Sequence, residues 1–143
     1  MRAIGFVTLR AREGFTEMPV DDLDRFRPID GVELPGSSAW LITDVDAGGA
    51  FRNVTPDDAL GTITREGRSP LTIDEGLALV THFPEVLEER NAFSMLGSRC
   101  GDRRVTAMWI SRGRPRLGWC WAGNPHTWLG SASCAGRLAA LGR

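Results

Sequence analysis

The second half of the chain repeats one pattern, in which a short apolar stretch is followed by a turn signal. The apolar stretches cover 93–99, 104–111, 116–122 and a segment from 126 or 127 to 133. The turn signals between them, rich in Gly, Asp, Asn and Pro, lie at 100–103, 112–115 and 123–125. Connections this short join neighbouring antiparallel strands, so the pattern predicts a meander of about four strands.

Two helices precede this meander, and each has a clear start signal. Thr55 is an N-cap followed by Pro56 at the first helical position, and Gly67 closes the segment. Residues 72–75 form a capping box, in which a Thr hydroxyl and a Glu carboxylate satisfy free backbone amides reciprocally. Pro84 ends this second helix because proline cannot continue it.

Helices first and hairpins afterwards predict an α+β fold. We expect two or three helices packed on the meander of about four C-terminal strands, with one or two further strands from the N-terminal part. The third helix would span 21–27, and the further strands 3–9 and 39–45, the latter buried. A length of 143 residues suits a single domain, with an irregular N-terminal segment at 1–36.

The meander predicts which side chains share a face of the sheet. With a four-residue loop at 112–115, Trp109 faces Gly118 and forms a large–small pair. Trp119 and Trp121 lie on the other face, and we expect both to pack in the core beneath the helices. Alternation along the strand then points Cys120 away from both of them.

Composition excludes several classes of enzyme. The chain has no Lys and no Tyr, which excludes a P-loop lysine, a Schiff-base lysine and a phenolic acid. Charge is divided unevenly although the net charge is only −1. Residues 1–89 carry seventeen acids and eight Arg, and residues 90–143 carry nine Arg and one acid. Either the two halves complement each other, or the basic half meets an anionic ligand.

An anion-binding cluster is the site that the sequence favours. The turns of the meander bring 99–104 and 123–126 to one end of the sheet. Arg presents a planar fork that matches phosphate or carboxylate, and His and Asn side chains can fix the orientation of the ligand. The expected ligand-binding residues are Arg99, Arg103, Arg104, Asn124 and His126. The alternative is that these Arg pair with the acidic helices around 57–89.

Metal sites have weaker support, and we expect no cofactor. Zinc ligand types occur at Cys100, Cys120, His126 and Cys134, but no CxxC pair is present. Asp44 and Asp46 share a strand face and could hold Mg²⁺, although a strand that ends in a polar turn has the same pattern.

A small enzyme, either a hydrolase or a transferase, is an alternative function. Its catalytic candidates are His126 as a base and Cys100 or Cys120 as a nucleophile, because a thiolate needs a nearby base and cationic surroundings. A protein–protein interaction module is a further alternative, with the acidic half or an exposed Trp as its contact surface.

Three segments resemble a family of uncharacterised proteins that is widespread in actinobacteria. They are SPLTIDEGLALVTHFPEVL (69–87), GSRCGDRRVTAMWIS (97–111) and LGWCWAGNPHTWLGSASC (117–134). The resemblance covers about residues 37–137. It implies a bacterial protein without an established activity, and it carries over no catalytic residues.

The leading hypothesis is therefore a small cytoplasmic ligand-binding domain. Its partner would be a small anionic molecule or an acidic peptide. Three Cys, an odd number, fit free thiols in a reducing compartment, and no apolar run is long enough to cross a bilayer. We expect no nucleic-acid partner, because the chain is acidic on balance and its Arg clusters lie at two ends of the predicted sheet.

Overall fold

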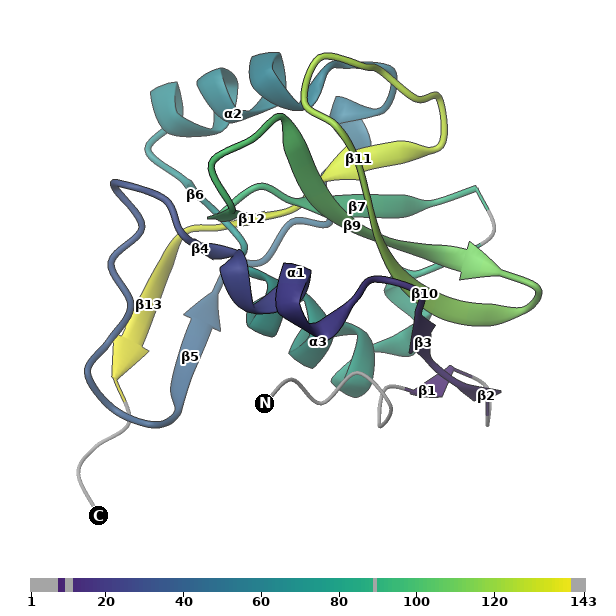
Figure 1. The fold of residues 1–143 in the computed structure, drawn as a ribbon. Helices are drawn as coiled ribbons and strands as arrows, with labels where there is room; N and C mark the ends of the chain where they lie inside the picture. Colours follow the sequence, from purple (N-terminus) through teal and green to yellow (C-terminus); the bar gives the residue numbers. More distant parts are fainter. Residues whose placement is uncertain (1–7, 10–11, 89, 140–143) are drawn as a thin grey trace.

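The computed structural model describes residues 8–9, 12–88 and 90–139, and it has an α+β fold (Figure 1). Its helices are α1 (Val20–Arg25), α2 (Pro56–Arg65) and α3 (Ile73–His82), with short 3-10 helices η2 (Gly49–Phe51) and η3 (Pro84–Val86). Its strands are β1 (Thr8–Leu9), β2 (Arg12–Glu13), β3 (Phe15–Thr16), β4 (Arg27–Pro28), β5 (Trp40–Thr43), β6 (Ser69–Pro70), β7 (Ala92–Met95), β8 (Ser98–Arg99), β9 (Arg104–Ser111), β10 (Arg114–Trp121), β11 (Leu129–Ser131), β12 (Ser133–Cys134) and β13 (Gly136–Ala139).

Both predicted helix starts are confirmed. The Thr55 hydroxyl accepts a hydrogen bond from the backbone N–H of Asp58 at 3.1 Å and caps α2. At α3 both bonds of the capping box form between Thr72 and Glu75. The helix expected at 21–27 is α1, whereas most of the strand expected at 3–9 lies outside the described residues.

The central sheet has five strands in the order β11-β7-β9-β10-β3. The three middle strands are antiparallel, as predicted, but both edge strands run parallel to their neighbours. The expected third hairpin, at the turn 123–125, is therefore wrong, because β11 pairs with β7 rather than with β10.

The loop after β10 explains why that hairpin does not form. Ala122 accepts a backbone hydrogen bond from Asp57, and His126 accepts one from Asn53. These bonds hold the loop against the start of α2, and Figure 1 shows it rising beside α2 before it returns as β11. The chain therefore crosses to the opposite edge of the sheet.

A two-residue turn joins β9 to β10, where the sequence suggested a four-residue loop. Arg112 and Gly113 both have positive φ angles, 55° and 74°, as a type I′ hairpin turn requires. The shorter turn shifts the register by two residues, so Gly118 pairs with Ala107 and not with Trp109. A shift of two keeps every side chain on its predicted face.

The sheet is covered on both sides, with α2 on one face and α1 and α3 on the other (Figure 1). Ala59 of α2 packs with Leu96 and Val105 in a small cluster. The larger cluster joins α1 and α3 to the opposite face of the sheet, through residues that include Leu23, Phe26, Leu77, Phe93, Met108 and Leu117.

The N-terminal segment is less irregular than expected. It supplies β3 to the central sheet, and Phe26, at the end of α1, is only 2% exposed. The prediction for Trp121 is also wrong, because this side chain is 48% exposed at the last position of β10. Trp119 is partly buried against the main core and contacts Trp121 edge-to-face.

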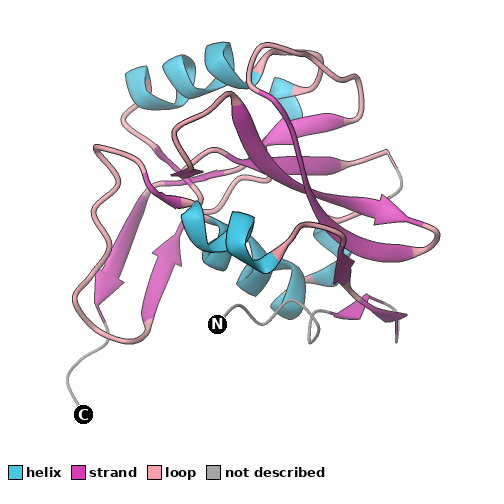
Figure 2. Cartoon of the chain, viewed as in Figure 1, coloured by secondary structure: helices cyan, strands magenta, loops and turns pink. Residues whose placement is uncertain are grey.

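Strands β5 and β13 form a separate two-stranded ribbon, which stands apart from the central sheet (Figure 2). The buried strand expected at 39–45 is thus wrong in its surroundings: β5 spans only Trp40–Thr43, and Leu41 is 68% exposed. Side chains on its other face still contact the rest of the fold, because Ile42 packs against the main core and the Trp40 indole donates to Glu75 of α3.

A buried ion pair attaches this ribbon to α3. Arg137 of β13 donates to both carboxylate oxygens of Glu75, at 2.6 and 2.8 Å, and both side chains are at most 6% exposed. The indole N–H of Trp40 and the backbone N–H of Thr72 also donate to this carboxylate, both at 2.9 Å. Arg137 further donates to the Ser69 hydroxyl at 2.7 Å, so the buried charges are well satisfied.

Candidate functional site

The Arg cluster expected from the sequence is mostly occupied by carboxylates of the chain itself. The Arg104 side chain is 13% exposed and contacts Asp102 at 2.9 Å and Asp22 at 3.2 Å. The pKa of Asp102 is lowered to about 2, mainly by the hydrogen bond from the Arg104 backbone N–H; burial opposes this, and the Cys100 and Arg104 side chains lower the pKa further. Arg99 donates to the backbone oxygen of Asp102 at 3.1 Å. Arg104 is therefore neutralised before any ligand arrives.

The other members of the expected cluster are distributed between two neighbourhoods. Arg103 forms an exposed ion pair with Asp57 of α2 at 2.8 Å. The Asn124 side chain is exposed, and its backbone N–H donates to Trp121. The His126 ring lies against the indole of Trp128, with 5.2 Å between centroids. The structure thus joins Arg99 and Arg104 at Asp102 and places His126 with Trp128.

Ion pairs join the basic half of the chain to the acidic half. The pairs are Arg103–Asp57, Arg104–Asp22, Arg116–Glu17 and Arg137–Glu75. Four of the nine Arg in residues 90–143 thus pair with acids of the other half, which agrees with the reading that the two halves complement each other.

The three Cys are free thiols in different surroundings. Cys100 donates to the Asp102 carboxylate at 3.2 Å, and Arg104 Nη2 lies 3.6 Å from its sulfur. Burial raises the pKa of Cys120 and of Cys134, which makes their reactive thiolate forms scarcer.

The candidate metal ligands do not come together. Among the described residues, no group of three or more His, Cys, Asp or Glu side chains could hold a metal ion. Asp44 pairs with Arg68 at 3.1 Å, and the Asp46 carboxylate accepts the backbone N–H of Gly48 at 2.7 Å. Both carboxylates thus bind groups of the protein itself near the turn that follows β5.

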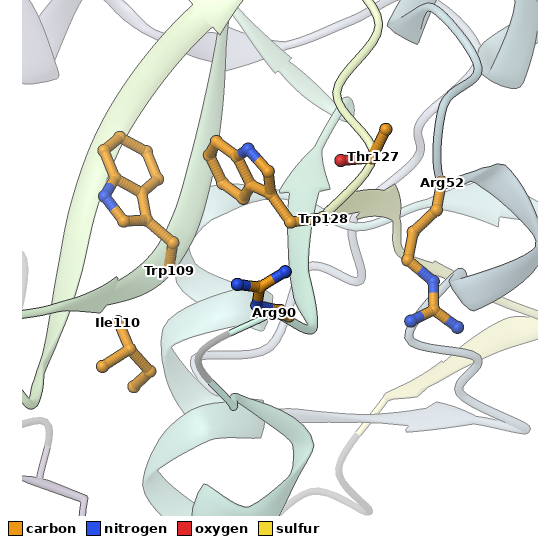
Figure 3. Close-up of a pocket in the computed structure, with 6 residues that line it drawn as sticks. All are labelled: Arg52, Arg90, Trp109, Ile110, Thr127 and Trp128. Carbon is orange, nitrogen blue, oxygen red and sulfur yellow. The ribbon is translucent and has the colours of Figure 1, made fainter.

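A pocket of about 700 Å³ lies at the end of the central sheet opposite to Arg104, and Figure 3 shows the side chains that line it. Its lining residues are Arg52, Arg90, Trp109, Ile110, Thr127 and Trp128. The topology explains why they meet. Strands β7 and β11 are parallel and β9 is antiparallel to β7, so the starts of β7 and β11 and the end of β9 share one end of the sheet.

The two Arg of this pocket differ in how they are held. Arg52 follows η2, donates through Nε to the backbone oxygen of Gly49 at 3.1 Å, and donates through Nη1 to the Asn91 side chain. Asn91 in turn donates to Glu88 at 3.1 Å. For Arg90, which precedes β7, the part of the chain that the structure describes offers no ion-pair partner. None of the described residues that line the pocket carries a carboxylate.

The two Trp form the apolar wall of the pocket. Their ring centroids lie 6.0 Å apart at an interplanar angle of 66°, an edge-to-face contact. The Arg116 guanidinium lies 5.4 Å from the centroid of Trp109. Gly118 lies beneath the same indole, and the missing Cβ makes room for it. Trp109 and Gly118 are thus in contact, as expected, although they are not directly paired.

Substitution of Gly118 by Ala tests this contact. An added Cβ would lie 2.2 Å from Cη2 of Trp109, so we expect the indole to move and the protein to lose about 1 kcal/mol of stability. Near-ultraviolet circular dichroism and urea unfolding measure the two effects. Gly36→Ala is the control, because nothing lies within 4 Å of its added Cβ. Unchanged dichroism in the Gly118 variant would show that Trp109 does not rest on this glycine.

Sequence reasoning did not find this pocket. The sequence pattern places Trp109 in a packing pair with Gly118, and it does not mark Arg52 or Arg90 as ligand-binding residues. The pocket depends on the parallel pairing of β7 with β11, which local turn signals do not encode. The signal that the sequence offers for this pocket is Trp128, which lies two residues after His126 in the segment that follows the predicted turn.

A comparison with protein-family models finds one match, to a family of unknown function (DUF5701), over residues 1–140. The chain belongs to this family. No curated protein and no solved structure matches it. The match to DUF5701 extends beyond 37–137, the range of the resemblance, and includes the N-terminal segment that supplies β3 and α1. None of the described helices is long and apolar enough to cross a membrane.

Proposed function

We propose that this protein binds a small anionic molecule in the pocket between Arg52 and Trp128. The observation that carries the proposal is the charge of the lining, where two guanidinium groups and no carboxylate occur among the lining residues that the structure describes. A guanidinium binds phosphate or carboxylate with charge-assisted hydrogen bonds, often two at a time. A volume of about 700 Å³ is in the range of small-molecule sites.

The pocket supports this function better than the cluster expected from the sequence. There Arg103 and Arg104 already contact Asp57, Asp22 and Asp102, and a ligand would have to displace these carboxylates. The expected class of ligand, a small anion or an acidic peptide terminus, is unchanged, but its proposed binding site is the pocket rather than the Arg cluster. His126 remains relevant because it supports Trp128 from the side.

The finer parts of the hypothesis belong to this proposal. The free thiols favour a reducing compartment, so we place the protein in the cytoplasm. The resemblance implies an actinobacterial source. A Cys-dependent enzyme and a protein-interaction module stay alternative hypotheses, and the raised pKa of Cys120 weighs against its use as a nucleophile.

Arg90→Gln tests the proposal. Titrated with inorganic phosphate and with citrate by calorimetry, the variant should bind about tenfold more weakly than the unchanged protein, since a hydrogen bond between charged groups contributes enough for one such factor. Circular dichroism and the urea midpoint should stay unchanged, because the Arg90 residue is exposed.

Arg103→Gln is the matched control, because it removes the same charge from the rival cluster. It should leave the affinity for both anions unchanged. Loss of binding in Arg103→Gln with retention in Arg90→Gln would move the site back to the cluster. If neither anion binds the unchanged protein at millimolar concentration, the proposed function is wrong.

A further inference from the structure

The indole of Trp128 is held by neighbours on two sides. His126 lies 5.2 Å from it at an angle of 35°, and Trp109 meets it edge-to-face at 6.0 Å. Its backbone oxygen accepts the N–H of Ala92 at 3.0 Å, which fixes it beside β7. Trp128 is therefore preorganised in the pocket wall, and a ligand that packs on it loses little to side-chain ordering.

The arrangement of the two indoles limits how an apolar group can enter. Because they already touch edge-to-face, a flat ring cannot be inserted between them and must stack on one indole. Figure 3 shows Arg90 below the ring of Trp128, and Arg52 farther to the right, past Thr127. A ring stacked on Trp128 thus has guanidinium groups within the same pocket.

We infer that the ligand combines a planar aromatic ring with an oxyanion group, the ring stacking on Trp128 and the oxyanion binding Arg90. The inference rests on the proposed function and adds the ring to it. Two sources share this chemistry: a nucleotide, with its base and phosphate, and a simple aryl phosphate or carboxylate. Arg52, fixed by Gly49 and Asn91, would receive a second acidic group or the ligand's acceptor atoms.

Four probes separate the contributions: adenosine 5′-monophosphate, adenosine, ribose 5-phosphate and phenyl phosphate. In the unchanged protein the monophosphate should bind about tenfold more tightly than ribose 5-phosphate, as stacking of one base on an aromatic side chain provides. Adenosine alone should bind at least as weakly as ribose 5-phosphate. Equal tight binding of phenyl phosphate identifies the general aryl oxyanion, and its weak binding identifies the nucleotide.

Two Trp variants make the test specific. Trp128→Leu should remove the tenfold preference, so that the monophosphate and ribose 5-phosphate bind this variant with similar affinity. Trp121→Leu, which changes a 48% exposed Trp elsewhere, should keep the preference. Far-ultraviolet dichroism and the urea midpoint confirm that each variant is folded.

Three results would overturn the inference. If ribose 5-phosphate binds as tightly as the monophosphate, the ring contributes nothing, and the anion-binding function still stands. If adenosine binds as tightly as the monophosphate, the oxyanion contributes nothing. If Trp121→Leu loses the preference and Trp128→Leu keeps it, the ring stacks elsewhere. Absence of binding by every anion, inorganic phosphate and citrate included, would remove the proposed function as well.

Discussion

Glu75→Gln should lower the free energy of unfolding by about 3 kcal/mol, because it leaves the buried Arg137 charge without its counterion. The change keeps the shape of the side chain, so the loss reports charge rather than packing. The amide also gives up one of the two oxygens that accept hydrogen bonds from Arg137, Trp40 and the Thr72 backbone. Urea unfolding at neutral pH measures the difference.

Glu17→Gln is the control for this first prediction. Glu17 contacts Arg116 at 3.6 Å, but its side chain is 68% exposed, so its loss should cost less than about 1 kcal/mol. Equal losses in the two variants would contradict the structural role of the buried pair.

The pH dependence of the same variant provides a second check. Burial alone would raise the pKa of Glu75, but the hydrogen bonds from Arg137, Thr72 and Trp40 outweigh burial and hold it below the ordinary 4.5. A lowered folded-state pKa stabilises the protein above the unfolded value, and this stability is lost as pH falls through the folded value. The gap between the unchanged protein and Glu75→Gln should thus be constant above about pH 5 and narrow below pH 4.5.

Gly130→Ala should also destabilise the protein by about 3 kcal/mol, at the upper end of what overpacking costs. An added Cβ would lie 2.1 Å from the backbone oxygen of Gly48, and a backbone atom cannot turn aside as a side chain can. Relief requires η2 and β11 to separate, and both flank the pocket. We therefore expect the urea midpoint to fall and anion binding to weaken together.

Gly136→Ala is the matched control, since Gly136 also lies in a paired strand. Its added Cβ would meet only Thr43 Oγ1 at 3.6 Å, an ordinary contact. The change should be neutral or stabilise by about 0.5 kcal/mol, because Ala loses less backbone freedom on folding than Gly. A fall in stability as large as that of Gly130→Ala would show that the close approach to Gly48 is not the cause.

Local chemistry made much of the fold predictable. The caps at Thr55 and Thr72 act through hydrogen bonds between residues three apart, so the sequence alone contains the whole interaction. The extent of β9 is as expected, and the alternation of faces in β9 and β10 survived an error of two residues in register. The two-residue turn between β9 and β10 was not predicted because Arg112 has a positive φ, which an Arg in the sequence does not indicate.

The site was harder to predict because it depends on contacts between distant residues. The residues of the expected anion cluster do not all come together, because Arg103 and Arg104 form ion pairs with carboxylates on α2 and α1. Arg90 and Trp128 became neighbours only through the pairing of β7 with β11. No turn or cap signals a parallel pairing between segments that are separated by three other strands, β8, β9 and β10.

The parallel edges of the central sheet have a consequence for how the protein is made. Its first edge strand, β3, joins a strand made about a hundred residues later, and Thr16 donates its hydroxyl proton to Leu117 across that span. Its other edge, β11, follows all the other strands of this sheet in the sequence. The sheet therefore cannot be completed on the ribosome until β11 has emerged. Its closure should be a late and slow step, because contacts between residues so far apart are the costliest to form.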